Sequence, residues 1–312
     1  MKSHLSPAVV SIVIAVYKNE KSIEPLFRRI ESMSGKLDSH INLEVIFVID
    51  GSPDRSLIEA KKLITASNQI EIKVYELSRN FGQLGAILAG LNKARGDAVI
   101  NISADLQDPP ELIEKMINSW QCGNEIVICA RADREDSFFQ RITSFIGYFF
   151  LSKGPHRVPK GGFDYFLISL APLKHLLAMK GRFRFFQGDI LGLGFPTALI
   201  SYTREKRKYG KSSYTFSKRF QVFVDSLIDI SYFPIKLITR AGILVSILGF
   251  ILALVTALRF FQGHAPFNGF TALLCAILIF GGIQIISIGL MGEYLFRVYD
   301  MLRERPVFII KD

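Results

Sequence analysis

A short acidic stretch holds the side chains with the clearest capacity for chemistry. It reads Ser103-Ala-Asp105-Leu-Gln107-Asp108 and follows an apolar run, Ala98–Ile102, that predicts a buried strand. Carboxylate and amide oxygens are the ligands that hard divalent cations prefer, and ligands of open α/β sheets bind at the carboxyl ends of the strands. The stretch therefore predicts a metal site for a phosphorylated substrate, with an ordinary strand-to-helix turn as the alternative.

The pair Pro109-Pro110 predicts that a helix opens directly after this stretch, because proline is tolerated in the first turn of a helix. Asp108 precedes the pair and is suited to cap the helix, since an aspartate oxygen accepts the free N–H groups of the first turn. We therefore expect Asp105 and Gln107 to bind the cation and Asp108 to cap the helix.

Strand and helix patterns alternate over the first 130 residues. Apolar, β-branched runs recur roughly every twenty to thirty residues, with helical spacing between them. This alternation predicts an α/β fold with a parallel, doubly wound sheet. The expected strands are Val9–Val16, Leu43–Ile49, Ile72–Leu77, Ala98–Ile102 and Glu125–Ala130, and the expected helices are Ile23–Met33, Glu59–Ala66, Gly82–Ala94 and Pro110–Cys122.

Beyond Arg134 this alternation stops. We expect a helix over Ser137–Leu151 that lies against a membrane surface and a loop over Gly161–Phe166. The segments Leu167–Met179 and Phe183–Leu193 follow that loop.

The usual nucleotide-loop signatures are absent from the sequence. No Gly-x-Gly-x-x-Gly follows the first strand, which argues against a nicotinamide cofactor. Gly210-Lys211-Ser212 resembles the end of a phosphate-binding P-loop, but Glu205 stands where that loop needs glycine. A P-loop is therefore excluded.

Charge and cysteine content limit the class of protein. The formal net charge is +10, which indicates nucleic acid, an anionic membrane face or a polyanionic substrate as a partner. Cys122, Cys129 and Cys275 have no metal-ligand spacing and fit reduced thiols in a cytosolic compartment. Residues 1–7 contain no signal peptide, so we expect the N-terminal part to stay in the cytosol.

The apolar excess lies after residue 240. Residues 241–261 carry no charge until Arg259, and Phe270–Met291 carry none. Each run is long enough to cross about 30 Å of hydrocarbon, which predicts a hairpin of two membrane spans over residues 240–262 and 269–292. Buried core helices are the alternative.

Basic residues flank the predicted hairpin on both sides. Lys236 and Arg240 precede it, and Arg297 and Arg303 follow it, so the positive-inside rule predicts that both flanks are cytosolic. Glycines such as Gly282 in the second span permit close helix contacts, either within the hairpin or between subunits, and a homo-oligomer is expected. The expected organisation is a cytosolic domain over 1–220, an interfacial helix over 221–239, the two spans, and a cytosolic tail over 293–312.

Residues 203–219 form a basic run in which seven Lys or Arg residues accompany one Glu. Tyr209, Tyr214 and Phe216 are interleaved with them. A solvated basic face or a nucleic-acid patch would have this composition. The nearby apolar spans favour binding of phosphate at a lipid surface instead.

A series of motifs runs in order through nearly the whole chain. The series comprises Val10–Glu20, Asp50-Gly-Ser, Ser78-Arg-Asn-Phe-Gly82, Ala104–Glu111, Arg204-x-x-Arg207-x-x-Gly210-Lys-Ser212, Gly292-Glu-Tyr-Leu295 and Arg305-Pro306. With the paired spans, it resembles the family-2 glycosyltransferases of the GT-A fold, which implies an α/β domain with a Rossmann-like, mostly parallel sheet. It is most similar to the membrane-bound polyprenyl-phosphate glycosyltransferases, which are relatives of dolichyl-phosphate mannose synthase.

The resemblance implies an inverting transfer of a sugar from a nucleotide-diphosphate sugar to a polyprenyl phosphate. It places the reaction at the cytosolic leaflet of a bacterial inner membrane, with the catalytic domain and both termini in the cytosol. The expected donor is UDP-glucose and the expected acceptor is undecaprenyl phosphate, with GDP-mannose or another UDP-sugar as alternative donors. The expected cofactor is Mg²⁺ or Mn²⁺, bound through Asp105 and Gln107, and no nucleic acid is expected as a partner.

The resemblance also assigns donor contacts. Asp50 would accept a ring N–H of the base, because a carboxylate can only accept; capping of the following helix is the alternative. Arg131 would touch the diphosphate, with a surface ion pair as the alternative. Ser103 stands where the family often has Asp, which leaves the cation more dependent on Asp105, Gln107, water and substrate phosphates. The remaining nucleoside contacts implied are Ala15, Tyr17 and Glu20.

The acceptor needs little base catalysis, because a phosphate monoester with a second pKa of about 6 is already largely ionised. The resemblance places Asp164 near the reacting sugar, for orientation or weak base work, with a structural loop role as the alternative. Asp189 is implied as a sugar contact. Binding of the acceptor phosphate is assigned to Arg204, Arg207, Lys211 and Ser212.

Three rival interpretations remain. A processive polysaccharide synthase needs more spans and a Gln-x-x-Arg-Trp element, whereas the only tryptophan here is Trp120. An inactive membrane scaffold would explain Ser103. A nucleic-acid binder would explain the net charge.

Overall fold

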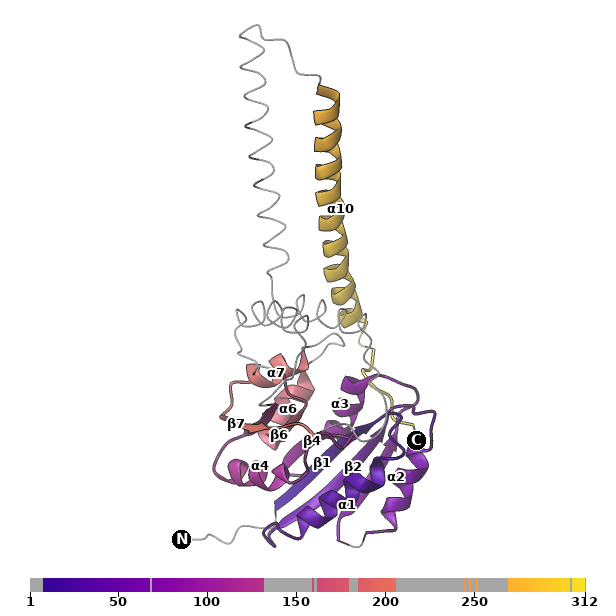
Figure 1. Cartoon of the computed structure of the whole chain (residues 1–312), viewed down its shortest axis with the longest axis vertical. Coiled ribbons are helices and arrows are strands. Elements are labelled where there is room, and N and C mark those ends of the chain that lie inside the picture. Colours follow the sequence, from indigo (N-terminus) through magenta and orange to yellow (C-terminus); the bar gives the residue numbers. More distant parts are fainter. Residues whose placement is uncertain are drawn as a thin grey trace. The chain divides into compact units, whose positions relative to one another are not determined.

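The chain consists of two compact units (Figure 1). Residues 1–220 together with 306–312 form the first unit, and residues 221–305 form the second. The computed structural model describes residues 8–67, 69–131, 159, 162–179, 185–205, 244, 247, 251, 269–303 and 305–311.

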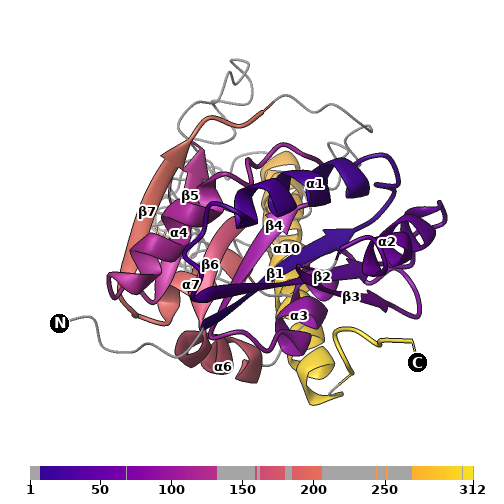
Figure 2. The same cartoon turned by 90° about the horizontal axis from the view of Figure 1, so that it is seen from below.

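Seven strands form one sheet in the first unit. They are β1 (Ala8–Val16), β2 (Ile41–Ile49), β3 (Glu71–Glu76), β4 (Ala98–Ser103), β5 (Ile126–Arg131), β6 (Tyr165–Ser169) and β7 (Thr197–Tyr202). Their order is β3-β2-β1-β4-β6-β5-β7 (Figure 2). Every neighbouring pair is parallel except those of β6, which runs antiparallel to β4 and β5. The predicted mostly parallel α/β sheet is therefore confirmed.

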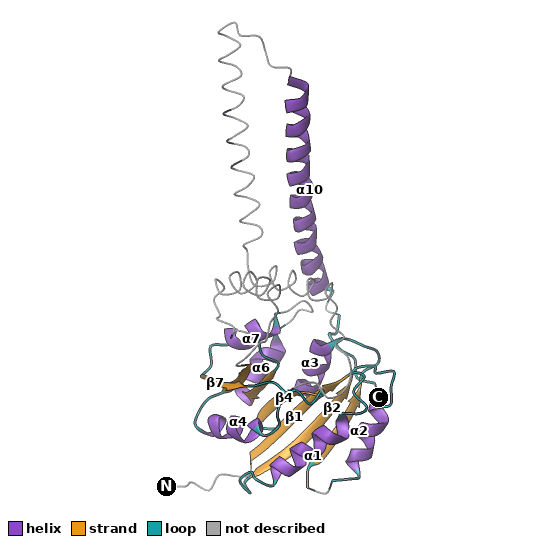
Figure 3. Ribbon diagram, viewed as in Figure 1, coloured by secondary structure: helices purple, strands orange, loops and turns teal. Residues whose placement is uncertain are grey.

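Helices cover both faces of this sheet (Figure 3). The apolar residues of α1 (Ile23–Ser34), α2 (Ser56–Ile64) and α4 (Leu112–Gln121) belong to one hydrophobic cluster. Those of α3 (Gln83–Lys93), α6 (Leu170–Ala178) and α7 (Phe186–Gly192) belong to a second cluster. The four predicted helices, α1 to α4, form within a few residues of the expected bounds, so each face of the sheet gains a packed layer.

The central strand β1 is buried on both faces of the sheet, because the side chains that alternate between the two faces are mainly apolar. Ile12 and Ile14 join the cluster under α1, whereas Val13 joins the cluster under α3. At Gly90 of α3, an added Cβ would lie 2.3 Å from Cγ1 of Val13. Glycine therefore lets α3 lie directly against β1.

Two strands depart from the sequence-based expectations. β6 begins at Tyr165, inside the expected loop Gly161–Phe166, and β7 occupies a segment where no strand is expected. β6 is five residues long and fully buried, and its apolar run continues into α6. A short apolar run of this kind cannot be distinguished from the start of a buried helix by its periodicity.

Helix α10 (Gly269–Leu302) belongs to the second unit and is 34 residues long. Over the side chains that the structure describes, no helix combines the length and the apolar character needed to cross a membrane. The membrane hairpin therefore stays a prediction. The expected helices over Ser137–Leu151 and 221–239, and nearly all of the expected span 240–262, lie outside the described residues.

The C-terminal residues return to the edge of the sheet in the first unit. Ile310 forms an antiparallel bridge with Leu77, and the main-chain N–H of Lys311 donates to the carbonyl of Glu76 at 2.7 Å. Phe308 packs against the hydrophobic cluster that contains Leu77 and α3. The tail thus covers the outer edge of β3, where unpaired strand groups would otherwise be exposed.

We expect a chain ending at residue 305 to be less stable than the intact chain. Loss of the edge pairing and of the apolar contacts over Leu77, which is 1% exposed, should cost about 2–3 kcal/mol. The melting temperature followed by circular dichroism in detergent should fall by about 5–10 °C.

The matched control for this deletion is Lys311→Ala in the intact chain. Its ammonium lies 3.2 Å from Glu76, but the side chain is 61% exposed, and exposed ion pairs contribute at most about 1 kcal/mol. We expect the control to melt within about 3 °C of the wild type. A truncated chain that melts like the wild type would show that the tail does not support the sheet.

Candidate active site

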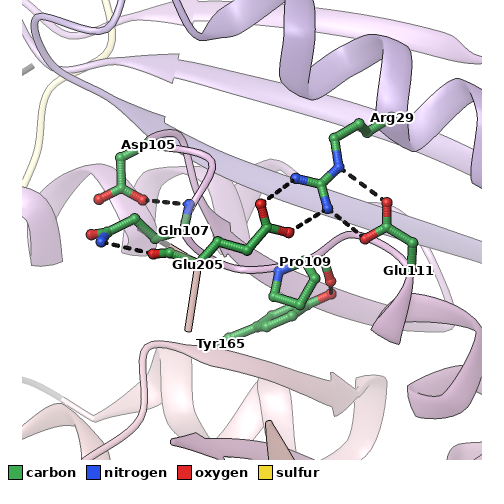
Figure 4. Close-up of polar contacts among 7 residues, drawn as sticks. All are labelled: Arg29, Asp105, Gln107, Pro109, Glu111, Tyr165 and Glu205. Atoms are coloured by element: carbon green, nitrogen blue, oxygen red, sulfur yellow. Dashed lines mark hydrogen bonds and ion pairs between the residues drawn. The ribbon is translucent and has the colours of Figure 1, made fainter. Parts of the chain in front are cut away.

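The loop that follows β4 forms the centre of the site (Figure 4). Leu106 has a φ of +60°, a left-handed conformation that costs a non-glycine residue about 1–3 kcal/mol. Its side chain is 3% exposed, so packing in the core holds the turn. The main-chain N–H of Gln107 donates to Oδ1 of Asp105 at 3.2 Å. The two predicted metal ligands therefore lie on one turn, at the carboxyl end of β4.

The predicted donor contacts gather at the same edge of the sheet. Ala15 of β1 pairs with Ser103 of β4 on one side and with Val48 of β2 on the other. Asp50 follows β2 directly. Parallel strands thus bring the ends of β1, β2 and β4 together, as expected from their pattern.

Asp108 does not cap the helix, so this prediction is wrong. Helix α4 begins at Leu112, and its capping position has no side-chain hydrogen bond. The main-chain N–H of Leu112 donates instead to the carbonyl of Pro109 at 3.2 Å. Asp108 is fully buried, and its Oδ1 accepts a hydrogen bond from the hydroxyl group of Tyr202 at 2.5 Å. The carboxylate therefore turns inward and joins the metal-ligand loop to β7.

Burial and the neighbouring Asp108 charge raise the pKa of Tyr202, so its hydroxyl stays protonated and donates. Among the contacts of the described residues, Oδ2 of Asp108 accepts no hydrogen bond although it is buried. A buried carboxylate oxygen of this kind is costly unless charge nearby compensates it. The local field therefore favours a cation at this loop.

Arg204 supplies one such positive charge. Its Nη2 lies 3.8 Å from Oδ2 of Asp105, and its Nε lies 3.5 Å from Oδ1 of Asp108. The residue follows β7, so the strand that sequence analysis missed delivers it to the loop. The structure thus brings a predicted acceptor residue beside a predicted metal ligand. Arg207, Lys211 and Ser212 lie outside the described residues.

A second ion pair lies between β5 and β6. Nη2 of Arg131 is 3.5 Å from Oδ2 of Asp164, and the Arg131 side chain is only 14% exposed. Arg131 thus forms an ion pair, as its alternative has it, with a partner that is 42% exposed, and its contact with the diphosphate stays a prediction. Burial raises the pKa of Asp164, and the charge of Arg131 partly opposes this shift. Asn101 holds the main chain here, since its Nδ2 donates to the carbonyl of Asp164 at 2.6 Å.

Asp50 organises a different helix from the one expected. Its carboxylate accepts the main-chain N–H of Phe81 at 2.7 Å and that of Gly82 at 3.0 Å, so it binds the start of α3. Burial raises the pKa of Asp50, and these two hydrogen bonds oppose the shift. Gly51 has a φ of +56°, and a Cβ there would lie 2.5 Å from the main chain of Arg79. Because each carboxylate oxygen has two lone pairs, Asp50 can accept a further ring N–H.

The loops after β1 and β2 are joined by hydrogen bonds. The main-chain N–H of Glu20 donates to Oδ2 of Asp54 at 3.3 Å, and Oε2 of Glu20 accepts the N–H of Arg55 at 3.1 Å. Tyr17, in the same loop, is 38% exposed. Glu20 therefore supports the loop that presents Tyr17, and both residues stay predicted nucleoside contacts.

Sequence analysis missed Arg29 and Tyr202. Arg29 lies on α1 and binds Glu111 and Glu205 (Figure 4). Glu205 is the one acid in the basic run, which was the available signal that it has a partner. Asp189 lies in the first turn of α7, and its role as a sugar contact stays a prediction.

The donor set at the loop fits a hard cation that arrives with a phosphorylated ligand. Asp105 offers one carboxylate, and Gln107 and Ser103 offer neutral oxygens. Within the described parts of the chain, no group of three or more His, Cys, Asp or Glu side chains could hold a metal ion. Mg²⁺ commonly takes few protein ligands and completes its shell with water and phosphate oxygens.

The region that carries these residues matches a known protein family. Residues 11–167 match the family described as glycosyl transferase family 2, a range that includes the loop after β4 and Asp164. The chain belongs to glycosyl transferase family 2. The predicted family and the predicted glycosyltransferase class are thereby confirmed.

Relatives in family 2 match almost the whole chain. A glycosyltransferase of uncharacterized function from Synechocystis sp. is 34% identical over 97% of this chain and 95% of its own length. A prophage-derived bactoprenol glucosyl transferase of Shigella flexneri is 31% identical over 97% of each chain. A prophage bactoprenol glucosyl transferase homolog of Escherichia coli is 32% identical over 97% of this chain and 98% of its own.

Solved structures show that this family 2 chain has the GT-A fold. Mannosyl-3-phosphoglycerate synthase from Rubrobacter xylanophilus superposes with a TM-score of 0.51 at 14% identity, over 70% of this chain and 71% of that one. Glucosyl-3-phosphoglycerate synthase from Mycobacterium tuberculosis, crystallised with Mn²⁺, UDP-glucose and phosphoglyceric acid, has a TM-score of 0.50 at 17% identity, over 75% and 80%.

Proposed function

We propose that this glycosyltransferase moves glucose from UDP-glucose to undecaprenyl phosphate, with inversion at the anomeric carbon. The observation that carries the proposal is the position of Arg204 3.8 Å from Asp105. A cation suited to an acceptor phosphate lies there beside the predicted ligand of the donor diphosphate. The bactoprenol glucosyl transferase relatives support glucose and a polyprenyl phosphate as the two substrates.

The donor half of the site would use the ends of β1, β2 and β4. Asp50 would accept a ring N–H of the base, Ala15 and Tyr17 would line the nucleoside, and Arg131 would contact the diphosphate. Asp105 and Gln107, with Ser103 beside them, would hold Mg²⁺ or Mn²⁺. When bound, the cation would neutralise charge that develops on the leaving nucleotide. The Mn²⁺ and UDP-glucose in the mycobacterial neighbour support this assignment.

The acceptor half would work by positioning. The acceptor phosphate is largely ionised near pH 7, so one of its oxygens can attack the anomeric carbon without a strong base. A new carbon–oxygen bond forms on one face of the sugar, while the bond to the nucleotide diphosphate breaks on the other. Arg204 would hold the attacking phosphate, and Arg207, Lys211 and Ser212 follow in the same basic run.

Asp164 would orient the sugar by accepting a hydrogen bond from one of its hydroxyl groups, a task suited to the ionised carboxylate. Its raised pKa means that this form is lost as the pH falls through a value above the ordinary one of about 3.9. We expect Asp164→Asn to lower kcat about a hundredfold.

The pH profile of Asp164→Asn should also change. In the wild type, both the acceptor phosphate and Asp164 must be ionised, so the acidic limb of log(kcat/KM) against pH should have a slope approaching two. In the variant only the phosphate titrates, so the slope should approach one. Wild-type kcat and an unchanged acidic limb in Asp164→Asn would show that Asp164 takes no part in the reaction. Asp97→Asn, at a carboxylate that accepts the main-chain N–H of Val9 at the amino end of β4, serves as the control.

The lipid acceptor requires a membrane location, and the apolar runs near the C-terminus support one. We place the enzyme in a bacterial inner membrane as a multi-pass homo-oligomer. Its catalytic domain, over 1–220, and both termini would be cytosolic. The interfacial helix, over 221–239, and the two spans would hold the enzyme at the membrane that contains the lipid acceptor.

A donor screen tests the proposal. Purified enzyme in detergent receives undecaprenyl phosphate, Mg²⁺ or Mn²⁺, and one radiolabelled donor at a time: UDP-glucose, GDP-mannose or another UDP-sugar. We expect label in the organic extract chiefly from UDP-glucose, and none after EDTA treatment. Label only from another donor would refute glucose transfer. Folded protein that transfers no sugar from any donor would support the scaffold interpretation.

A further inference from the structure

Arg29 makes an unusual double contact near the site. Its Nε and Nη2 lie 3.0 and 2.7 Å from the two carboxylate oxygens of Glu111. Its Nη1 and Nη2 lie 3.2 and 2.7 Å from the two carboxylate oxygens of Glu205 (Figure 4). One guanidinium thus binds two carboxylates in bidentate fashion, a geometry that is stronger and more directional than an ordinary surface pair.

Glu205 is also fixed through its main chain. Its N–H donates to the carbonyl of Gln107 at 3.0 Å, and its carbonyl accepts Nε2 of Gln107 at 3.2 Å. The one acid of the basic run is therefore bound to the metal-ligand loop by its backbone and to α1 by its side chain. Because Arg204 precedes Glu205 directly, these contacts also determine where Arg204 lies relative to Asp105.

The Glu111 end of the contact lies next to the same loop. Glu111 stands at the start of α4, two residues after Pro109, whose carbonyl accepts the hydroxyl proton of Tyr165 at 3.2 Å. Figure 4 shows Arg29 between the two glutamates, with the loop of Asp105 beside them. Glu111 is 54% exposed and Glu205 is 32% exposed, so Glu205 is the more enclosed partner.

The charge of Glu205 affects how anionic substrates can bind near Arg204. The proposed reaction brings a diphosphate and an acceptor phosphate to the residues around Arg204. A bare carboxylate at Glu205 would repel both, since like charges a few ångströms apart disfavour each other. Arg29, Glu111 and Glu205 together keep a net charge of −1, but the guanidinium lies directly against Glu205, offsets the charge of that acid and holds its carboxylate toward α1.

We propose that Arg29 is a positioning residue for the acceptor: by binding Glu205, it places Arg204 beside Asp105 and offsets the negative charge of Glu205 near the acceptor phosphate. The inference rests on the proposed function, because it needs an anionic acceptor. Arg29 itself would touch no substrate. Its effect should therefore appear in the KM for the acceptor and not in the KM for the donor.

The test measures both KM values for purified wild-type enzyme and for Arg29→Met, with undecaprenyl phosphate in detergent. We expect the acceptor KM to rise about tenfold and the donor KM to change less than about twofold. Arg29→Lys keeps the positive charge but loses the planar guanidinium that makes the bidentate contacts, so it should give an intermediate acceptor KM. Glu111→Gln is the matched control, because it removes one partner and leaves Glu205 bound; its acceptor KM should stay within about twofold.

A double-mutant cycle tests the route through Glu205. In a Glu205→Gln background, which has no charge to neutralise, Arg29→Met should change the acceptor KM less than about threefold. An unchanged acceptor KM in Arg29→Met would overturn the inference, and so would equal rises in both KM values or a full tenfold effect in the Glu205→Gln background. Absence of transfer by the wild-type enzyme would instead refute the proposed function.

Discussion

The Asp105→Ala enzyme is expected to lose sugar transfer by about a thousandfold while keeping its fold. Asp105 is the charged member of the predicted cation site, and its Oδ2 lies 3.8 Å from Nη2 of Arg204. The substitution would remove the ligand that holds positive charge against the leaving diphosphate, and losing such stabilisation costs about 10²–10³ in kcat. Leu106 keeps its packing, so the melting temperature should change little.

Asp97→Ala is the matched control for this prediction, because Asp97 precedes the amino end of the same strand. Its Oδ2 accepts the main-chain N–H of Val9 at 2.9 Å, away from the carboxyl edge of the sheet. We expect the control to transfer sugar within about threefold of the wild type in the radiolabel assay. If Asp105→Ala kept more than about a tenth of wild-type activity, Asp105 could not be the main ligand.

The second large effect is expected at Asp108, on stability. A helix cap contributes about 1 kcal/mol. Asp108 is a buried charge that is hydrogen-bonded to Tyr202 and ion-paired with Arg204, and removing one member of such a buried pair costs more than a cap contributes. Because Arg204 is 25% exposed, we expect Asp108→Ala to cost about 2–3 kcal/mol and to lower the melting temperature by about 5–10 °C.

An aspartate that accepts the first main-chain N–H of a helix supplies the comparison. Oδ1 of Asp54 accepts the main-chain N–H of Ser56 at 3.1 Å at the start of α2, so Asp54→Ala should lower the melting temperature by about 2–4 °C. Tyr202→Phe removes only the hydroxyl that donates to Asp108 and should fall between the two. Equal shifts for Asp108→Ala and Asp54→Ala would mean that the buried contacts of Asp108 contribute no more than a cap.

The predictable part of the fold was the part with long, regular patterns. Strands β1, β2 and β4 are buried on both faces and therefore appear in the sequence as unbroken apolar runs. Because such strands are parallel, their carboxyl ends must meet, and the apolar pattern is therefore enough to predict Ala15, Asp50 and Ser103 at one edge. The positions of Asp105 and Gln107 follow from that placement.

The missed features depend on partners that are far apart in the sequence. Asp108 precedes a proline pair, which is a capping pattern, yet its hydroxyl donor Tyr202 lies 94 residues away. Arg29 occupies an ordinary helix position, and its partner Glu205 is 176 residues distant. Strand β7 brings both distant partners to the site, so overlooking that short edge strand hid these contacts together.

The most direct test of the account is the chemical structure of the lipid product made from UDP-glucose and undecaprenyl phosphate. Mass spectrometry counts the phosphates between lipid and sugar, and NMR of the anomeric proton gives the configuration. Attack by the acceptor phosphate on the anomeric carbon predicts one bridging phosphate and a configuration opposite to that of the donor. A product with two phosphates, a retained configuration, or no glucosylated lipid at all would contradict it.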